Sequence, residues 1–381
     1  MTMWRIIFFT PVLFSVLAMI YLSSRVCRFG AVRSVSGRLR RWALGFGIVL
    51  GLFLACGHLL GVVNAVICLL HFALIWLACD LASFIVRKTL RQPASQRYHA
   101  GSAAVLLSVL ALSAGWYLGH HVWRTDYAFE TEKAVKSLRV VMFADSHTGT
   151  TFHADGFARH AAAMQQAEPD VVIVSGDFVD DETTREDMAA TCRTLGAMKT
   201  AHGVYFVFGN HDKSYYGAQR RGYSAADLAA ELEKNGVHVL TDEAVLVADS
   251  FYVIGRRDLS VENEQGGRRA SMAELVRDLD KGKYMIVADH QPADCARQEE
   301  AGVDLVLSGH THGGQLFPFN QVGKWIGAND LVYGHEKRGG TDFVVTSGIS
   351  DWAIKFKTGT KSEFVVIDVK GKGKAETQAS E

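Results

Sequence analysis

The chain has 381 residues, of which 49% are hydrophobic, and its 40 basic and 40 acidic side chains give a formal net charge of zero. That zero conceals an uneven distribution, because residues 1–125 hold 12 Lys or Arg and one acid, Asp80, while the remainder holds 28 basic and 39 acidic residues. This uneven distribution of charge excludes a single domain of uniform composition and indicates two parts that join near residue 125. Because the second part is acidic, we expect no nucleic-acid partner.

Four apolar stretches predict four transmembrane helices, so that residues 1–124 form a membrane region. They are residues 6–23, 42–62, 64–86 and 103–118. A signal peptide is the alternative for the first stretch, since Arg5 precedes an apolar run that ends in small residues. The second and third stretches nearly touch, so the chain has to turn tightly at Asn64 or its neighbours.

Basic residues in the short loops set the expected orientation. Six arginines lie between the first two stretches and four basic residues between the last two, whereas the hairpin near Asn64 has none. Basic loops stay in the cytoplasm. We therefore expect a multi-pass membrane protein with the large C-terminal domain outside the cytoplasm. A helix count wrong by one would reverse this orientation.

The C-terminal part divides into a polar connector at 125–138, a catalytic domain at 139–370 and a disordered Lys-, Gly- and Ala-rich tail at 371–381. Short apolar runs predict buried strands at 140–143, 171–174, 204–208, 285–287 and 305–307. Helical spacing occurs at 157–166, 186–198, 225–235 and 271–279. This alternation predicts an α/β fold, and shorter late runs favour mixed rather than purely parallel sheets.

A short polar cluster follows each of the five strands. The clusters are Asp145-Ser146-His147, Gly176-Asp177, Gly209-Asn210-His211-Asp212, Asp289-His290 and Gly309-His310-Thr311-His312. Ligands of open α/β sheets collect at the carboxyl ends of the strands. We therefore expect the clusters to converge and to form a metal site.

The side chains of these clusters suit a pair of divalent cations. Two cations about 4 Å apart need a carboxylate that touches both, a role that suits Asp177. Asp145 and His147 can hold the first metal, Asn210 and His290 can hold the second, and His310 and His312 can serve one metal each. A site of carboxylate, amide and imidazole without thiolate favours manganese, iron or zinc, and we favour manganese.

His211 is then left without a metal. An imidazole at that place can donate a proton to a departing alkoxide, while the metal pair supplies a hydroxide from bound water. Asp212, the next residue, is placed in the sequence to orient the His211 ring. We predict both residues to be catalytic.

In this order and at these intervals, the motifs DSH, GD, GNHD, a solitary His and GHTH resemble the calcineurin-like metallophosphoesterase superfamily over residues 138–370. The apolar N-terminus, the continuation to Gln315 and the segment 331–334 are similar to its membrane-associated bacterial branch. The resemblance implies a four-layer α-β-β-α sandwich with His211 as general acid. It implies Asp145, His147, Asp177 and His312 as ligands of one metal, and Asp177, Asn210, His290 and His310 as ligands of the other.

Two departures limit what the resemblance implies. Ser146 and Thr148 stand where relatives often carry bulkier apolar residues. The segment 352–357 has no counterpart of the proline and arginine that relatives commonly show before the last strand, although Lys355 could partly replace that arginine. A phosphate-binding role for this segment is therefore left open.

These observations predict a membrane-anchored dinuclear phosphoesterase that uses metal-activated hydroxide. Anchoring at a bilayer favours a phosphodiester or pyrophosphate bond of a lipid-linked substrate. The alternatives are a phosphomonoesterase, nucleotidase or phosphoprotein phosphatase and, from another class, a membrane signalling or scaffold protein with a vestigial metal site. The sequence does not predict the oligomeric state.

Overall fold

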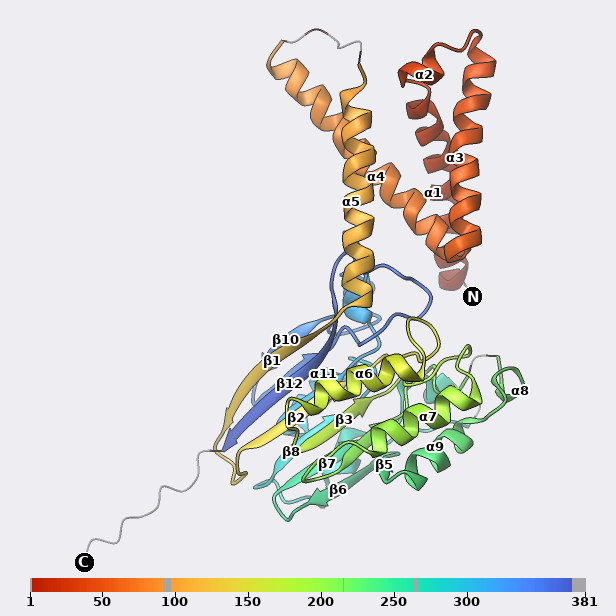
Figure 1. Ribbon diagram of the computed structural model, residues 1–381. Helices are drawn as coiled ribbons and strands as arrows, with labels where there is room; N and C mark the ends of the chain where they lie inside the picture. Colours follow the sequence, from red (N-terminus) through yellow and green to blue (C-terminus); the bar gives the residue numbers. More distant parts are fainter. Residues whose placement is uncertain (1, 92, 94–96, 215, 264–265, 372–381) are drawn as a thin grey trace, which may run out of the picture. The chain divides into compact units, whose positions relative to one another are not determined.

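The computed structural model describes residues 2–91, 93, 97–214, 216–263 and 266–371. The chain folds as two compact units (Figure 1). One comprises Met1–Tyr117 and Ala353–Phe356, and the other comprises Leu118–Trp352 and Lys357–Glu381. The boundary falls a few residues before the position that the charge distribution predicts.

The first unit is helical. Its helices are α1 (Thr2–Val26), α2 (Gly30–Arg33), α3 (Arg38–Leu60), α4 (Val62–Thr89) and α5 (His99–His120). Within the described residues, α3, α4 and α5 are long and apolar enough to cross a membrane, whereas Val12–Val26 of α1 is a shorter apolar stretch. The tight turn lies at Gly61, whose φ of +88° suits glycine.

Asp80, the single acid of this unit, is paired. Its carboxylate lies 2.9 Å from Arg25 Nε and accepts hydrogen bonds from Tyr98 Oη at 2.7 Å and Tyr21 Oη at 3.1 Å. A carboxylate among apolar helices is costly unless it is paired. The cluster therefore ties α1 and α4 to the start of α5.

Four residues from late in the chain belong to the helical unit. Asn64 donates from Nδ2 to the carbonyl of Ala353 at 3.0 Å and accepts from the amide of Lys355 at 2.8 Å. The ring of Phe356 lies 5.7 Å from that of Trp116. Asn64 stands at the start of α4 and Trp116 near the end of α5. The start of α4 and the end of α5 thus both contact this short segment.

Two mixed sheets form the second unit. The strands are β1 (Val122–Thr131), β2 (Leu138–Phe143), β3 (Val171–Ser175), β4 (Val204–Val207), β5 (Val237–Val239), β6 (Glu243–Val247), β7 (Phe251–Gly255), β8 (Tyr284–Ala288), β9 (Leu305–Ser308), β10 (Gly334–Arg338), β11 (Thr341–Val345) and β12 (Ser362–Gly371). The sheet orders are β1-β12-β2-β3-β4-β5 and β10-β11-β9-β8-β7-β6. Parallel pairs dominate, and β12–β2, β6–β7 and β10–β11 are antiparallel.

Helices α6 (Ala154–Gln165), α7 (Arg185–Gly196) and α9 (Ala225–Lys234) cover the outer face of one sheet, and α10 (Met272–Val276) and α11 (Cys295–Glu300) cover that of the other. The chain also forms α8 (Ala218–Arg221), α12 (Val322–Trp325), which has no buried residue, and short 3-10 turns at Leu259–Asn263 and His312–Gly314. As Figure 1 shows, α6, α7 and α9 lie side by side over the first sheet. The side chains of Thr184 and Ser271 accept the N-cap hydrogen bonds of α7 and α10.

Three apolar clusters hold the layers together. Met142, Ile173, Val253 and Ile286 belong to a buried cluster between the sheets. A second cluster packs α6, α7 and α9 onto one outer face, and a third packs α10 and α11 onto the other. This arrangement is the predicted four-layer α-β-β-α sandwich.

The structure differs from the prediction at both ends of this unit. Residues 122–131, much of the expected connector, form β1, which pairs in parallel with β12 over ten residues. Its side chains alternate between half-buried and exposed, so the polar residues occupy one face of a strand. At the other end β12 includes Gly371, and the rest of the predicted tail, 372–381, lies outside the described residues.

Candidate metal centre

The five predicted clusters meet at the carboxyl ends of β2, β3, β4, β8 and β9. Three groups of His and acidic side chains result, and within each group one potential ligand atom per residue lies within 4.8 Å of the others. Two of the groups are formed entirely by predicted metal ligands. They are Asp145, His147 and His312, and Asp177, His290 and His310.

The first group comes from the ends of β2 and β9. The rings of His147 and His312 are stacked with centroids 5.1 Å apart. His312 Nε2 lies 3.9 Å from Asp145 Oδ1, and His147 Nε2 lies 3.7 Å from Asp177 Oδ2. Two imidazoles and two carboxylates thus face a common point.

Asp177, which belongs to the second group, also faces His147 of the first group. The same Oδ2 of Asp177 lies 3.1 Å from His290 Nε2. Asn210 Oδ1 lies 3.1 Å from His290 Nε2 and 2.9 Å from His310 Nδ1. A single carboxylate oxygen therefore stands between the two groups, where a ligand bridging two cations has to be.

The pKa shifts of His147 and Asp145 are consistent with a cation-binding site. His147 Nε2 is buried and lacks a hydrogen-bond partner in the described structure. Burial opposes a charge on this ring, but the Asp180 hydrogen bond and the charges of Asp177 and Asp145 raise the pKa of His147 to about 9. Burial and the neighbouring charge of Asp177 raise the pKa of Asp145 to about 6. A divalent cation at Nε2 would take the place of the Nε2 proton and offset the charge of the carboxylates.

The backbone of the site is unusual. Asp145, His147, Asp177, His310 and His312 all have positive φ, between +36° and +70°. Non-glycine residues rarely adopt this conformation, which costs about 1–3 kcal/mol each and clusters at functional sites. Five of the seven predicted ligands thus lie on turns that the surrounding fold holds in place.

Glycines of the motifs allow the loops to approach closely. A Cβ on Gly209 would lie 2.1 Å from Asp177 Oδ1, and one on Gly176 would lie 2.6 Å from the amide of Gly209. Neither position has room for a side chain. The glycines therefore let Asp177 and Asn210 reach one centre.

Asp180 is a site residue that the sequence reasoning missed. Its Oδ2 lies 3.0 Å from His147 Nδ1 and its Oδ1 lies 3.0 Å from His211 Nδ1. Burial opposes its charge, but the hydrogen bonds from both histidines hold the pKa of Asp180 well below its usual range. This carboxylate fixes two rings with the Nδ1 proton directed toward it, which leaves Nε2 of each ring for other chemistry.

Asp212 does not have the place that we expected. Its two oxygens accept hydrogen bonds from the amides of Gly209, Asp177, Phe178 and Val179 at 2.8–3.0 Å. A carboxylate aligned with four amides anchors the loops that carry Asp177 and Asn210. The orienting contact with His211 is made by Asp180 instead.

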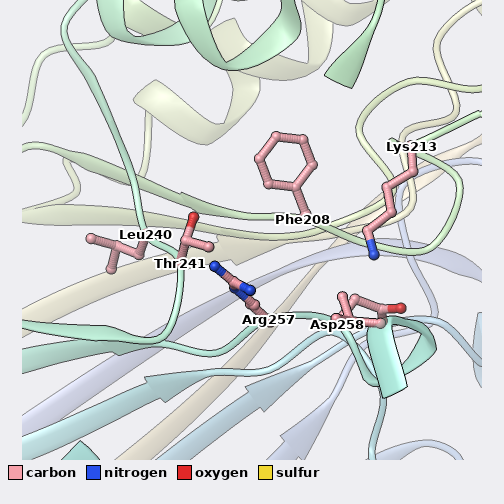
Figure 2. Close-up of a pocket in the computed structure, with 7 residues that line it drawn as sticks. Phe208, Lys213, Leu240, Thr241, Arg257 and Asp258 are labelled. Carbon is pink, nitrogen blue, oxygen red and sulfur yellow. The ribbon is translucent and has the colours of Figure 1, made fainter. Parts of the chain in front are cut away.

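Trp352 and a small cavity border the centre. The Trp352 ring lies 5.9 Å from that of His211. A cavity of about 230 Å³ is lined by Phe208, Lys213, Leu240, Thr241, Arg257, Asp258 and Val261. Figure 2 shows the Lys213 ammonium and the Arg257 guanidinium extending into the space below the Phe208 ring.

Short links join this cavity to the second metal group. Lys213 follows His211 by two residues, and Gln291, next to His290, donates from Nε2 to both oxygens of Asp258 at 3.1 and 2.9 Å. Arg257 Nε lies 3.6 Å from Asp242. Two cationic side chains thus line a space directly beside the centre.

Two clusters of His and Asp side chains lie at the strand ends of two packed mixed sheets, and the Asp177 carboxylate stands between them. This arrangement is that of a dinuclear metallohydrolase site. The family model described as calcineurin-like phosphoesterase matches residues 138–314. An uncharacterized metallophosphoesterase of Aquifex aeolicus is 30% identical over 251 residues, which cover 65% of this chain and 91% of that protein. The chain therefore belongs to the calcineurin-like phosphoesterase family.

Other relatives are longer than the matched region. An uncharacterized metallophosphoesterase of Campylobacter jejuni is 29% identical over 62% of this chain and 60% of its own length. A transmembrane protein with metallophosphoesterase domain from Danio rerio is 29% identical over 62% of this chain and 54% of its own length. The match thus spans about three fifths of the length of several curated relatives.

A solved structure of a dimetal phosphatase from Danio rerio aligns with a TM-score of 0.37 at 12% identity, covering 55% of this chain and 87% of that one. The family assignment rests on the sequence matches above.

Proposed function

We propose that this protein is a membrane-anchored phosphoesterase that hydrolyses a phosphodiester or pyrophosphate bond with two divalent metal ions, of which manganese is favoured. The observation that carries the proposal is the position of Asp177 Oδ2, 3.1 Å from His290 and 3.7 Å from His147. Asp145, His147, Asp177 and His312 would hold one ion. Asp177, Asn210, His290 and His310 would hold the other.

Two such ions supply a Lewis acid for the phosphoryl oxygens and a nucleophile from water at neutral pH. The protein's part is positioning and proton transfer. With its Nδ1 proton held by Asp180 at 3.0 Å, His211 can give a second proton from Nε2 to the leaving oxygen, and the carboxylate stabilises the imidazolium that carries it.

The cavity beside the centre supports a phosphodiester or a pyrophosphate as the substrate. A monoester leaves little to fill the space between Lys213 and Arg257, whereas these cations can hold a second phosphate of a pyrophosphate. The neighbourhood of Trp352 supports a lipid-linked substrate, because the next four residues, Ala353–Phe356, belong to the unit of apolar helices.

The first test measures hydrolysis of bis(p-nitrophenyl) phosphate and p-nitrophenyl phosphate by the full-length protein in detergent. Metal is removed by chelation, and manganese, zinc or iron is added back. We expect activity to return best with manganese, to be lost in Asp177→Asn and to favour the diester. A preference for the monoester would support a phosphomonoesterase. Inactivity of metal-loaded, folded protein toward both esters, with a cellular phenotype that survives His211→Ala, would support the scaffold alternative.

The role of the cavity has its own test. We expect Lys213→Ala and Arg257→Ala to raise KM for a pyrophosphate diester by about tenfold each, as for loss of one charge-assisted hydrogen bond, and to change KM for bis(p-nitrophenyl) phosphate little. Arg268→Ala is the matched control, since Arg268 is an exposed cation whose partner is Glu274. Equal effects of all three substitutions would refute the assignment.

We also propose that the protein crosses a bacterial inner membrane several times, with the catalytic domain outside the cytoplasm. The apolar helices and the basic loops support this placement. Protease added to intact spheroplasts should remove a C-terminal epitope tag. Protection of the tag until the membrane is broken would place the domain in the cytoplasm and reverse the orientation.

A further inference from the structure

Exposed apolar side chains in the catalytic unit are concentrated in one short segment. Phe317, Phe319, Trp325 and Ile326 are 62%, 63%, 71% and 58% exposed, and they are four of the eight exposed large apolar residues described in that unit. Together they present roughly 500 Å² of apolar surface, near the upper end for the largest patch on a soluble monomer. We call residues 316–326 the aromatic segment.

The backbone of the aromatic segment is held in place. Phe319 and Val322 close successive turns onto Leu316 and Phe319, and α12 follows. The amide of Phe317 donates to Thr358 Oγ1 at 3.1 Å, and the amides of Thr358 and Gly359 donate to the carbonyl of Gln315. The apolar side chains therefore project from an ordered support and do not belong to a chain end.

The support of the aromatic segment leads directly to the apolar helices. Thr358 follows Phe356 by two residues, and Ala353–Phe356 belong to the helical unit through Asn64 and Trp116. Asn64 stands where α4 begins and Trp116 stands near the end of α5. The ends of spanning helices are the places where the chain leaves a bilayer. The aromatic segment is thus tied by hydrogen bonds to a stretch of chain that starts at the membrane surface.

We infer that the aromatic segment inserts into the lipid interface of the same membrane that the helices cross. Trp and Phe are the side chains that favour this depth, and Lys324, half-exposed beside them, can keep its ammonium among the headgroups. The segment follows His312, one of the proposed metal ligands, by four residues in the chain. The inference rests on the proposed membrane anchoring and not on the catalytic proposal.

Site-specific photocrosslinking of the full-length protein in nanodiscs of phosphatidylethanolamine and phosphatidylglycerol tests the inference. A benzophenone amino acid replaces Phe319, Leu246 or Leu52 in separate samples that contain a fluorescent phospholipid. Leu246 is exposed on β6, at one edge of its sheet, whereas Lys324 of the aromatic segment lies 3.9 Å from Glu336 on β10, at the other edge of that sheet. Leu52, exposed on α3, reports on membrane crossing itself.

We expect lipid adducts from positions 319 and 52 and none from position 246. Adducts at 52 without adducts at 319 would overturn the inference and leave the membrane anchoring intact. Adducts of 319 with a second protein molecule in place of lipid would also overturn it, since the segment would then be a protein interface. Absence of adducts at 52 would refute the anchoring, and with it the basis of the inference.

Tryptophan fluorescence gives a second readout that needs no catalysis. The difference in emission between the wild type and Trp325→Phe isolates Trp325 among the seven tryptophans. We expect this difference signal to be lost when the nanodisc lipids carry bromine on the upper acyl chain. A difference signal that is equal in brominated and ordinary lipid would show that Trp325 lies outside the interface.

Discussion

Replacing Asp180 with Asn should weaken the centre through two histidines at once. The carboxylate holds His147 Nδ1 and His211 Nδ1, each at 3.0 Å, and it also accepts the amide of Asp181 at 2.7 Å. An amide side chain keeps one acceptor oxygen and turns its NH₂ group toward the other ring. That ring loses its acceptor and can move its proton to Nε2, which for His147 blocks the metal.

The size of the effect follows from these contacts. A hydrogen bond to a charged group is worth about 1.5–3 kcal/mol, and partners of metal-ligating histidines typically change metal affinity or activity by about 10–100-fold. We therefore expect Asp180→Asn to lose about 10–100-fold in manganese affinity, in kcat at saturating manganese, or in both. Loss of affinity reports on His147, and loss of kcat reports on His211.

Calorimetric titration of manganese and hydrolysis of bis(p-nitrophenyl) phosphate measure the two quantities on the full-length protein. Asp187→Asn is the matched control, because Asp187 Oδ2 lies 2.8 Å from Nδ1 of the exposed His153, which belongs to none of the metal groups. Wild-type affinity and kcat in Asp180→Asn would refute the role of this carboxylate. An equal loss in Asp187→Asn would attribute the effect to general destabilisation.

Three further outcomes can be checked. Asp177→Asn should lower kcat at saturating manganese by at least about a hundredfold, because the bridging charge is removed, and near-normal activity would contradict a shared ligand. Lys357→Met should destabilise the catalytic domain by about 3–5 kcal/mol in chemical denaturation, since it leaves the buried Asp351, 3.4 Å from the ammonium, without its cation; a cost below about 1 kcal/mol would show that the pair is dispensable. Arg139, 2.8 Å from Asp368, lowers the pKa of that half-exposed carboxyl, so Arg139→Gln should cost at most about 1 kcal/mol at neutral pH. Because a lowered pKa stabilises only while the carboxyl is ionised, this difference should vanish as the pH falls below the usual range of Asp, and a difference that persists in acid would contradict the ion pair.

The strands and the convergence of the five polar clusters could be predicted because both depend on local sequence. A strand buried on both faces, such as β3, is a continuous apolar run, and polar residues directly after it must lie at the sheet edge. The positions of Asp145, Asp177 and His310 follow from this rule alone. Their left-handed backbone conformations do not, since these depend on how neighbouring loops pack.

Asp180 and β1 show what local sequence leaves out. Asp180 lies three residues beyond Asp177 in a loop, where side chains follow no regular spacing, so the sequence does not indicate that it faces His147 and His211. Asp212 is the carboxylate next to His211 in the sequence, and it was therefore the residue that we predicted. The alternation in β1 is a weak signal because its core-facing side chains are only half-buried at a sheet edge. Its partner, β12, is the last strand that the structure describes and lies far from β1 in the sequence.

The pairing of β1 with β12 has a consequence for the order in which the protein is made. Strand β1, which follows α5 in the chain, has β12 as its only neighbour among the strands that the structure describes, and β12 is the last of these strands to be synthesised. Until then, β1 has no partner strand, and β2 lacks the strand that separates it from β1. A chain truncated before Ser362 should therefore expose unpaired backbone along β1 and one edge of β2 and become a substrate for quality-control proteases, even though every proposed metal ligand is present.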